Sequence, residues 1–109
     1  MEAGRLDRRV QFRRAVIGTG PFGQVETWSD LGAPVWASKT DISDGERWRA
    51  GAVSAQVTTR FRIRWSLWAA EITPKDRLVC EGRSYEIAGI KEIGRREGLE
   101  MTAAARIDG

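Results

Sequence analysis

The chain is most constrained by a strict alternation of side chains over residues 54–65, SAQVTTRFRIRW. One parity holds Ala55, Val57, Thr59, Phe61, Ile63 and Trp65, and the other holds Ser54, Gln56, Thr58, Arg60, Arg62 and Arg64. A period of two repeated this often predicts a β-strand with one buried and one solvated face. At ~3.3 Å per residue this strand is about twice the usual length, so we expect it to bend or its first half to project from the body.

Other segments also have the period or the punctuation of strands. The predicted strands are an N-terminal segment around Leu6–Arg13, the runs 24–30 and 34–41 with a Leu-Gly-Ala-Pro turn between them, a hairpin over 77–90 that turns at Glu81-Gly82-Arg83, and a last strand over 99–105 after the turn 94–98. The sequence therefore predicts an all-β fold, a small sandwich or barrel of about six strands.

The segment 41–56, DISDGERWRAGAVSAQ, is the one region without a strand pattern. Ser43 or Asp44 can cap a helix ahead of Glu46, so we expect a short helix of about two turns within a long loop. Its candidate functional residues are Asp41, Asp44, Arg47, Trp48 and Arg49. An aromatic side chain between two arginines is typical of an interface hot spot or a base-stacking platform, although Trp48 could equally pack back onto its own barrel.

Length and composition favour one soluble domain over residues 1–109. A chain of 109 residues can enclose one hydrophobic core, and its apolar fraction of 41% contains no run of the roughly 18 residues that a membrane span requires. The N-terminal MEAGRLDRRVQF places arginines where a signal peptide has its apolar region, so an intracellular protein is expected. Cys80 is the single cysteine, which excludes an intramolecular disulfide.

The sequence also argues against catalysis, metal binding and cofactor binding. It contains no histidine, the usual general base and the commonest metal ligand, and a zinc site without histidine and with one cysteine would need carboxylates alone. The string GTGPFG matches a dinucleotide-binding G-x-G-x-x-G, but Pro21 interrupts it and a strand-like run follows. We therefore interpret it as a hairpin loop and predict no catalytic residues, no metal and no cofactor.

The basic residues leave two interpretations open. The formal net charge is +3, and fifteen of the eighteen basic residues are arginine, which suits protein interfaces and nucleic acids alike but also follows from a GC-rich genome. The face formed by Arg60, Arg62 and Arg64 could contact solvent or another subunit, or it could face DNA. A monomeric nucleic-acid-binding barrel would place aromatic rings and cations on the same face, whereas this strand places them on opposite faces.

Several fragments, taken in order and spacing, resemble the phage head-tail joining family, the head completion or stopper proteins of long-tailed phages, prophages and gene-transfer particles. The fragments are AGRLDRRVQFRR, FGQVETWSDLGAPVWAS, ITPKDRLVCEGRSYEIAGI and GLEMT. The resemblance implies a small non-enzymatic β-barrel that assembles in the bacterial cytoplasm and acts in the virion, with no membrane partner. It also implies a homo-oligomeric ring between the portal-adaptor proteins and a tail-terminator or tail protein, which completes the head, docks the tail and helps to retain packaged double-stranded DNA.

By position alone, the resemblance makes segment 41–56 a candidate gate in the channel of that ring. Two alternative functions remain at the level of sequence. One is the monomeric nucleic-acid-binding barrel, and the other is a neighbouring virion component such as a tail-terminator ring or a minor capsid protein.

Overall fold

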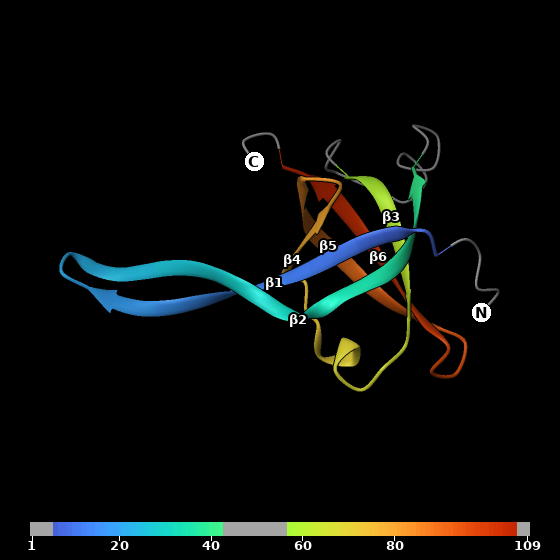
Figure 1. Cartoon of the computed structure of the whole chain (residues 1–109), viewed down its shortest axis with the longest axis horizontal. Coiled ribbons are helices and arrows are strands. Elements are labelled where there is room, and N and C mark those ends of the chain that lie inside the picture. Colours follow the sequence, from blue (N-terminus) through green and yellow to red (C-terminus); the bar gives the residue numbers. More distant parts are fainter. Residues whose placement is uncertain (1–5, 43–56, 107–109) are drawn as a thin grey trace.

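The structure, a computed structural model, describes residues 6–42 and 57–106; for residues 57 and 58 it describes the backbone alone. The described part contains the strands β1 (Arg8–Gly20), β2 (Gly23–Asp41), β3 (Val57–Arg64), β4 (Arg77–Cys80), β5 (Arg83–Ile93) and β6 (Gly98–Ala105), and the 3-10 helix η1 (Ala69–Glu71). All neighbouring strands are antiparallel and close into a barrel in the order β1-β2-β3-β6-β5-β4 (Figure 1). The predicted all-β barrel of about six strands is confirmed.

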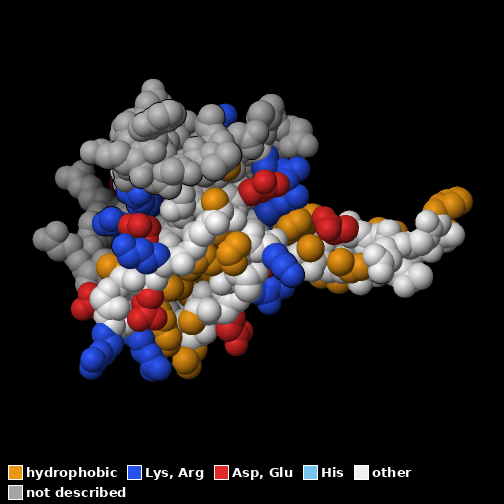
Figure 2. All heavy atoms as spheres, turned by 180° about the vertical axis from the view of Figure 1, so that it is seen from behind, with side chains coloured by type: hydrophobic (Ala, Val, Ile, Leu, Met, Phe, Trp, Pro, Cys, Tyr) orange, Lys and Arg blue, Asp and Glu red, His pale blue; other side chains and the backbone are white. Residues whose placement is uncertain are grey.

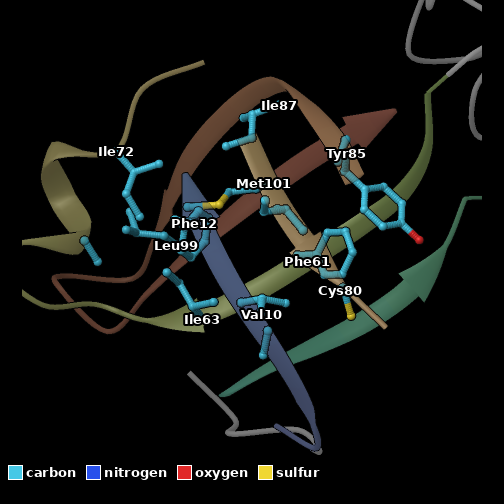
Figure 3. Packing of buried hydrophobic residues seen from close by; sticks show 14 residues of the cluster. Val10, Phe12, Phe61, Ile63, Ile72, Cys80, Tyr85, Ile87, Leu99 and Met101 are labelled. Carbon is cyan, nitrogen blue, oxygen red and sulfur yellow. The ribbon is translucent and has the colours of Figure 1, made fainter. Parts of the chain in front are cut away.

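The barrel core is built from the inward parity of each strand. Phe61 and Ile63 of β3 are buried together with Val10, Phe12, Leu78, Tyr85, Ile87, Leu99 and Met101 from the other strands (Figure 3). Phe61 meets Tyr85 edge to face, with ring centroids 5.0 Å apart, a favoured geometry for aromatic pairs. The alternation read in residues 59–64 thus has the predicted physical cause, since one parity fills the core and the other lies outside it.

The segment between β3 and β4 closes one end of the barrel. Ser66 starts the turn that becomes η1, because its Oγ accepts a hydrogen bond from the Ala69 amide at 3.2 Å. Ala69 and Ile72 are buried against the core, and Trp68 lies edge to face with Phe12 at 6.2 Å. The sequence reading placed no helix here, because three helical residues are too few to produce a periodic pattern.

The predicted Leu-Gly-Ala-Pro turn is wrong, since β2 runs through it without reversing. Val10 is opposite Val35 whereas Phe12 is opposite Leu31, so residues 32–34 of β2 stand across from Gln11 alone. Such an excess on one strand is a β-bulge, and Gly32 takes the positive φ of 69° that glycine tolerates. The Gln11 side-chain amide donates to the Gly32 carbonyl at 3.0 Å and holds the bulge in place. Glycine and proline therefore mark an irregularity within a strand here, not its end.

The longest strands of the described chain are β1, with 13 residues, and β2, with 19 residues. Residues 54–56 lie outside the described part, and from Val57 onward β3 pairs with β6 along its length, so its described part does not project. Instead, the far halves of β1 and β2 leave the barrel as a two-stranded hairpin, visible as the blue and cyan ribbon in Figure 1. Its turn is Pro21-Phe22, between the paired Gly20 and Gly23. The GTGPFG string is therefore a hairpin turn, as predicted.

Candidate assembly surfaces

The arginines of β3 lie on the outer face of the barrel and are partly neutralised within the subunit. Arg62 is opposite Glu100 of β6, and its Nε donates to Glu100 Oε2 at 2.8 Å. Arg60 Nε lies 3.4 Å from the other oxygen of the same carboxylate. One glutamate therefore offsets two of the three cations, while Arg64 lies further along the strand, at the edge of a groove described below.

The same strand offers no exposed aromatic ring beside its arginines. Phe61 has no exposed surface, because it fills the barrel core. A base cannot stack on a ring that is fully covered by protein, so the exposed face of β3 provides cations without a stacking platform. Within β3 this geometry counts against the nucleic-acid-binding barrel, whereas Trp65, which follows Arg64, is partly exposed and lines the groove described below.

Only the first of the five candidate gate residues lies in the described part of the chain. Asp41 is exposed at the end of β2. Asp44, Arg47, Trp48 and Arg49, and the helix predicted for this segment, lie outside the described residues. The gate therefore stays a prediction.

The most distinctive surface is the projecting hairpin, residues 14–29, which we call the arm. Its ladder runs from the pair Arg14 and Ser29 to the pair Gly20 and Gly23. β4 pairs with β1 only as far as Arg13, and β3 pairs with β2 only from Ala37 onward. Within the described chain, the outer edges of both arm strands are therefore left without a neighbouring strand.

The side chains of the arm are largely apolar and exposed. Ile17 is 63% exposed, Val16 and Val25 are about half exposed, and Phe22 at the tip is fully exposed. No charged residue occurs from Ala15 to Val25. In Figure 2 hydrophobic side chains lie along the inner part of the arm and at its tip, whereas basic and acidic ones gather on the barrel and near the arm's base. Natural edge strands are usually protected by charges, so the absence of charge over residues 15–25 of the arm indicates a surface that a partner covers.

On the β1 side, a salt bridge anchors the base of the arm to the barrel. Both oxygens of Asp76 accept hydrogen bonds from Arg14, at 2.9 and 3.0 Å, and Arg14 Nη2 also donates to the Glu71 carbonyl at 3.0 Å. Asp76 is only 2% exposed, and it accepts a further bond from the Thr73 amide at 2.8 Å. Burial alone would raise the pKa of Asp76, but the bonds from Arg14 and Thr73 outweigh it and lower that pKa below its usual value.

On the β2 side, the base of the arm is held through Trp28. The guanidinium of Arg77 stacks over the Trp28 ring at 3.9 Å, and Arg13 Nη2 donates to the Trp28 carbonyl at 2.7 Å. Both strands of the arm are thus fixed to the barrel before they project. The arm is a supported ribbon with a defined direction.

A second apolar surface lies on the barrel, and we call it the tryptophan groove. It has a volume of about 360 Å³ and is lined by Leu6, Pro34, Val35, Trp36, Arg64, Trp65, Ser66 and Trp68. Trp36 is 52% exposed, with the guanidinium of Arg9 at 4.8 Å from its ring. The structure shows it half exposed because it lies on the outward parity of β2, next to the buried Ala37.

Within residues 6–42 and 57–106, the groups that could bind a metal ion or act as a nucleophile are few. The described residues contain no group of three His, Cys, Asp or Glu side chains placed to bind a metal ion, and no described helix is long and apolar enough to cross a membrane. Burial raises the pKa of the Cys80 thiol, with a smaller contribution from Glu81. This thiol is therefore held in its protonated, weakly nucleophilic form.

The arm and its anchor were not identified from the sequence. One signal was present, because residues 15–25 form the uncharged run AVIGTGPFGQV, centred on a hairpin turn. The anchor had no such signal, since Arg14 and Asp76 are separated by 62 positions and only the fold brings them together.

Comparison with known proteins agrees with a structural role. The model of the phage head completion protein family matches residues 1–106. The head completion protein gp7 of Enterobacteria phage HK97 is 34% identical over 95 residues, which cover 86% of this chain and 81% of gp7. Protein SF1141 from Shigella flexneri 2a, solved in solution, has a TM-score of 0.81 at 28% identity over the whole of both chains. A chain from the virion of a native gene transfer agent particle shares the fold, with a TM-score of 0.63 at 23% identity over 93% of this chain and 96% of that one.

Proposed function

The chain belongs to the phage head completion protein family, and from this premise we propose that its copies form a ring between the head and the tail of a phage-type particle. As a head completion protein it is a structural component of a virion and not an enzyme. In the proposed ring, one side meets the portal-adaptor proteins and the other docks a tail-terminator or tail protein. The ring encircles packaged double-stranded DNA and helps to retain it, and it assembles in the bacterial cytoplasm.

The observation that carries this proposal is the exposed arm, which carries no charge over residues 15–25. A free monomer gains nothing from holding Ile17 and Phe22 in water at the end of an anchored ribbon. A subunit of an assembly does gain from it, because the arm can bury these side chains against a neighbour. Repetition around a ring would also turn the small net charge of +3 per chain into a band of positive potential suited to DNA.

The segment 41–56 is proposed as the part that enters the channel. Its residues Asp41, Asp44, Arg47, Trp48 and Arg49 include cations for phosphate contacts and one aromatic ring. In the sequence it connects β2, which ends at Asp41, to β3, which begins at Val57.

Electron microscopy of particles produced without this chain tests the proposal. We expect heads that fail to join tails and that lose their DNA, and we expect the chain supplied from a plasmid to restore both properties. Particles that still join tails and keep their DNA without the chain would contradict the proposed function.

The substitution Arg62→Glu tests the role of the outer face of β3. It removes the 2.8 Å ion pair and places a second carboxylate beside Glu100, but the position is exposed, so we expect a stability loss of only about 1 kcal/mol. We propose that this face contacts another subunit, and we therefore expect loss of ring assembly, measured by sedimentation velocity and by electron microscopy of complemented particles.

The matched control for this substitution is Arg95→Glu, which makes the same charge change at an exposed turn outside β3. We expect the control to assemble normally. If the Arg62→Glu chain forms rings normally but the complemented particles lose their DNA, this face points toward the channel instead.

A further inference from the structure

We propose that the arm of one copy inserts its apolar tip, centred on Phe22, into the tryptophan groove of a second copy. This inference rests on the proposed ring, and it specifies the contact that joins neighbouring subunits. The occupant of the groove is thus a known segment of this same chain. The two surfaces differ from each other, so the contact joins the arm of one copy to the groove of the next.

The arm has the properties of an inserted element. Phe22 is fully exposed at the turn, and Ile17 and Val25 are exposed behind it. Because residues 15–25 carry no charge, the arm can enter an apolar site without removing an ion from water. The anchors at Asp76 and Trp28 fix its direction, which reduces the conformational entropy that docking would otherwise cost.

The groove has the size and the chemistry to receive the tip. An apolar cavity of about 150 Å³ is sufficient to bind benzene, and the groove has a volume of about 360 Å³. Tryptophan rings form much of its lining, and they favour edge-to-face contact with a phenyl ring. Arg64 is the one charged side chain in the lining, so an uncharged apolar tip leaves no like charge opposed across the contact.

The arm cannot reach the groove of its own chain. Phe22 and Pro34 lie on the same segment twelve positions apart, and an extended strand rises ~3.3 Å per residue, so tip and groove are about 40 Å apart. The molecule is 48 Å along its longest axis, consistent with this separation. The ladder from Arg14–Ser29 to Gly20–Gly23 keeps the arm extended. The two apolar surfaces can therefore meet only between copies.

A contact between two different surfaces has a structural consequence. It is heterologous, and repeated heterologous contacts close into a ring when the rotation between neighbours fits and otherwise continue as a filament. Pairing of the same open edge in two arms would instead be isologous and would stop at a dimer. The two arrangements predict different behaviour for variants of the arm and of the groove.

The test uses two variants of the full chain, Phe22→Ser and Trp36→Glu, studied by sedimentation velocity over a range of concentrations. Both positions are solvent-exposed, so we expect each variant to fold like the wild type. An unchanged circular dichroism spectrum and an unchanged melting temperature would show this. We expect the wild type to self-associate, and each variant alone to do so about 10- to 100-fold more weakly. The matched control Leu67→Ser removes another exposed apolar side chain, outside both surfaces, and is expected to leave association unchanged.

The decisive measurement is the equimolar mixture of the two variants. The Trp36→Glu chain keeps an intact arm and the Phe22→Ser chain keeps an intact groove, so we expect the mixture to form one-to-one heterodimers of near wild-type affinity that do not grow further. A mixture that remains monomeric, a Trp36→Glu chain that associates like the wild type, or a wild type that stays monomeric at millimolar concentration would each overturn the proposal. These results are independent of the particle experiment, which alone tests the proposed head-to-tail function.

Discussion

Replacement of Arg14 by methionine is expected to lower the free energy of unfolding by about 3 kcal/mol at pH 7. Methionine retains most of the apolar stem but removes the guanidinium that makes two bonds to Asp76. Asp76 is 2% exposed, so its carboxylate would remain charged in a poorly solvated site. Its remaining side-chain partners would be the amide and the hydroxyl of Thr73. Chemical denaturation monitored by tryptophan fluorescence measures this loss.

The converse substitution, Asp76→Asn, serves as the control and is expected to cost less, about 1–2 kcal/mol. The Arg14 side chain is 42% exposed, so without its partner it can still be hydrated. The asparagine carbonyl can still accept the bond from the Thr73 amide. Equal losses for the two variants, or a larger loss for Asp76→Asn, would contradict the account in which the buried carboxylate dominates.

The pH dependence of the Arg14→Met effect gives a second and independent check. In the wild type the pKa of Asp76 is lowered, so its contribution to stability is present above the unfolded value of about 3.9 and is lost as pH falls through the folded pKa. Without Arg14, burial is the largest influence on the pKa of Asp76 and only the bonds from Thr73 oppose it, so we expect that pKa to rise and the variant to gain stability when the carboxyl takes up a proton. The stability difference between wild type and variant should therefore shrink from pH 7 toward pH 4, and a constant difference would exclude the electrostatic explanation.

The strands that the sequence predicted well have a local physical cause. Thr59, Phe61 and Ile63 face the core while the arginines between them face outward, so burial itself imposes the period of two. The hairpin of β4 and β5 was equally accessible, because its turn uses Glu81 and Gly82, both with positive φ. A glycine in that position is a recognised signal for a tight hairpin turn. Where one face is buried and the turn is short, sequence alone is sufficient.

The arm and the bulge could not be derived in the same way. The arm has no buried face, so its side chains carry no alternation that distinguishes inside from outside. At the bulge, glycine and proline occur in the composition of a turn, and only pairing with β1 decides that β2 continues. The candidate site shares this limitation, since the arm, its anchor and the groove are brought together by contacts distant in the sequence. The outward parity of Arg60, Arg62 and Arg64 could be read from the sequence because it depends on local alternation, whereas the role of this face stays a prediction.

Replacement of Gly32 by valine is expected to lower the free energy of unfolding by about 3 kcal/mol. Gly32 has a φ of 69°, a conformation that is especially unfavourable for a β-branched residue. A Cβ at this position would also lie 3.1 Å from two carbons of the Trp68 ring, so the added methyl groups would push against that ring. Thermal and urea denaturation, compared with the wild type, measure the loss.

The neighbouring substitution Ala33→Val separates this effect from a general effect of valine in the bulge. Ala33 is exposed and has no positive φ, so we expect a change within about 0.5 kcal/mol. Because Trp68 lines the tryptophan groove and also contacts Phe12, displacement of its ring by Gly32→Val should weaken self-association as well as stability. A Gly32→Val chain that is as stable as Ala33→Val would show that the backbone can flip to negative φ and that the bulge is not held by Gly32. Normal self-association in a destabilised Gly32→Val chain would show that the groove does not depend on the position of Trp68.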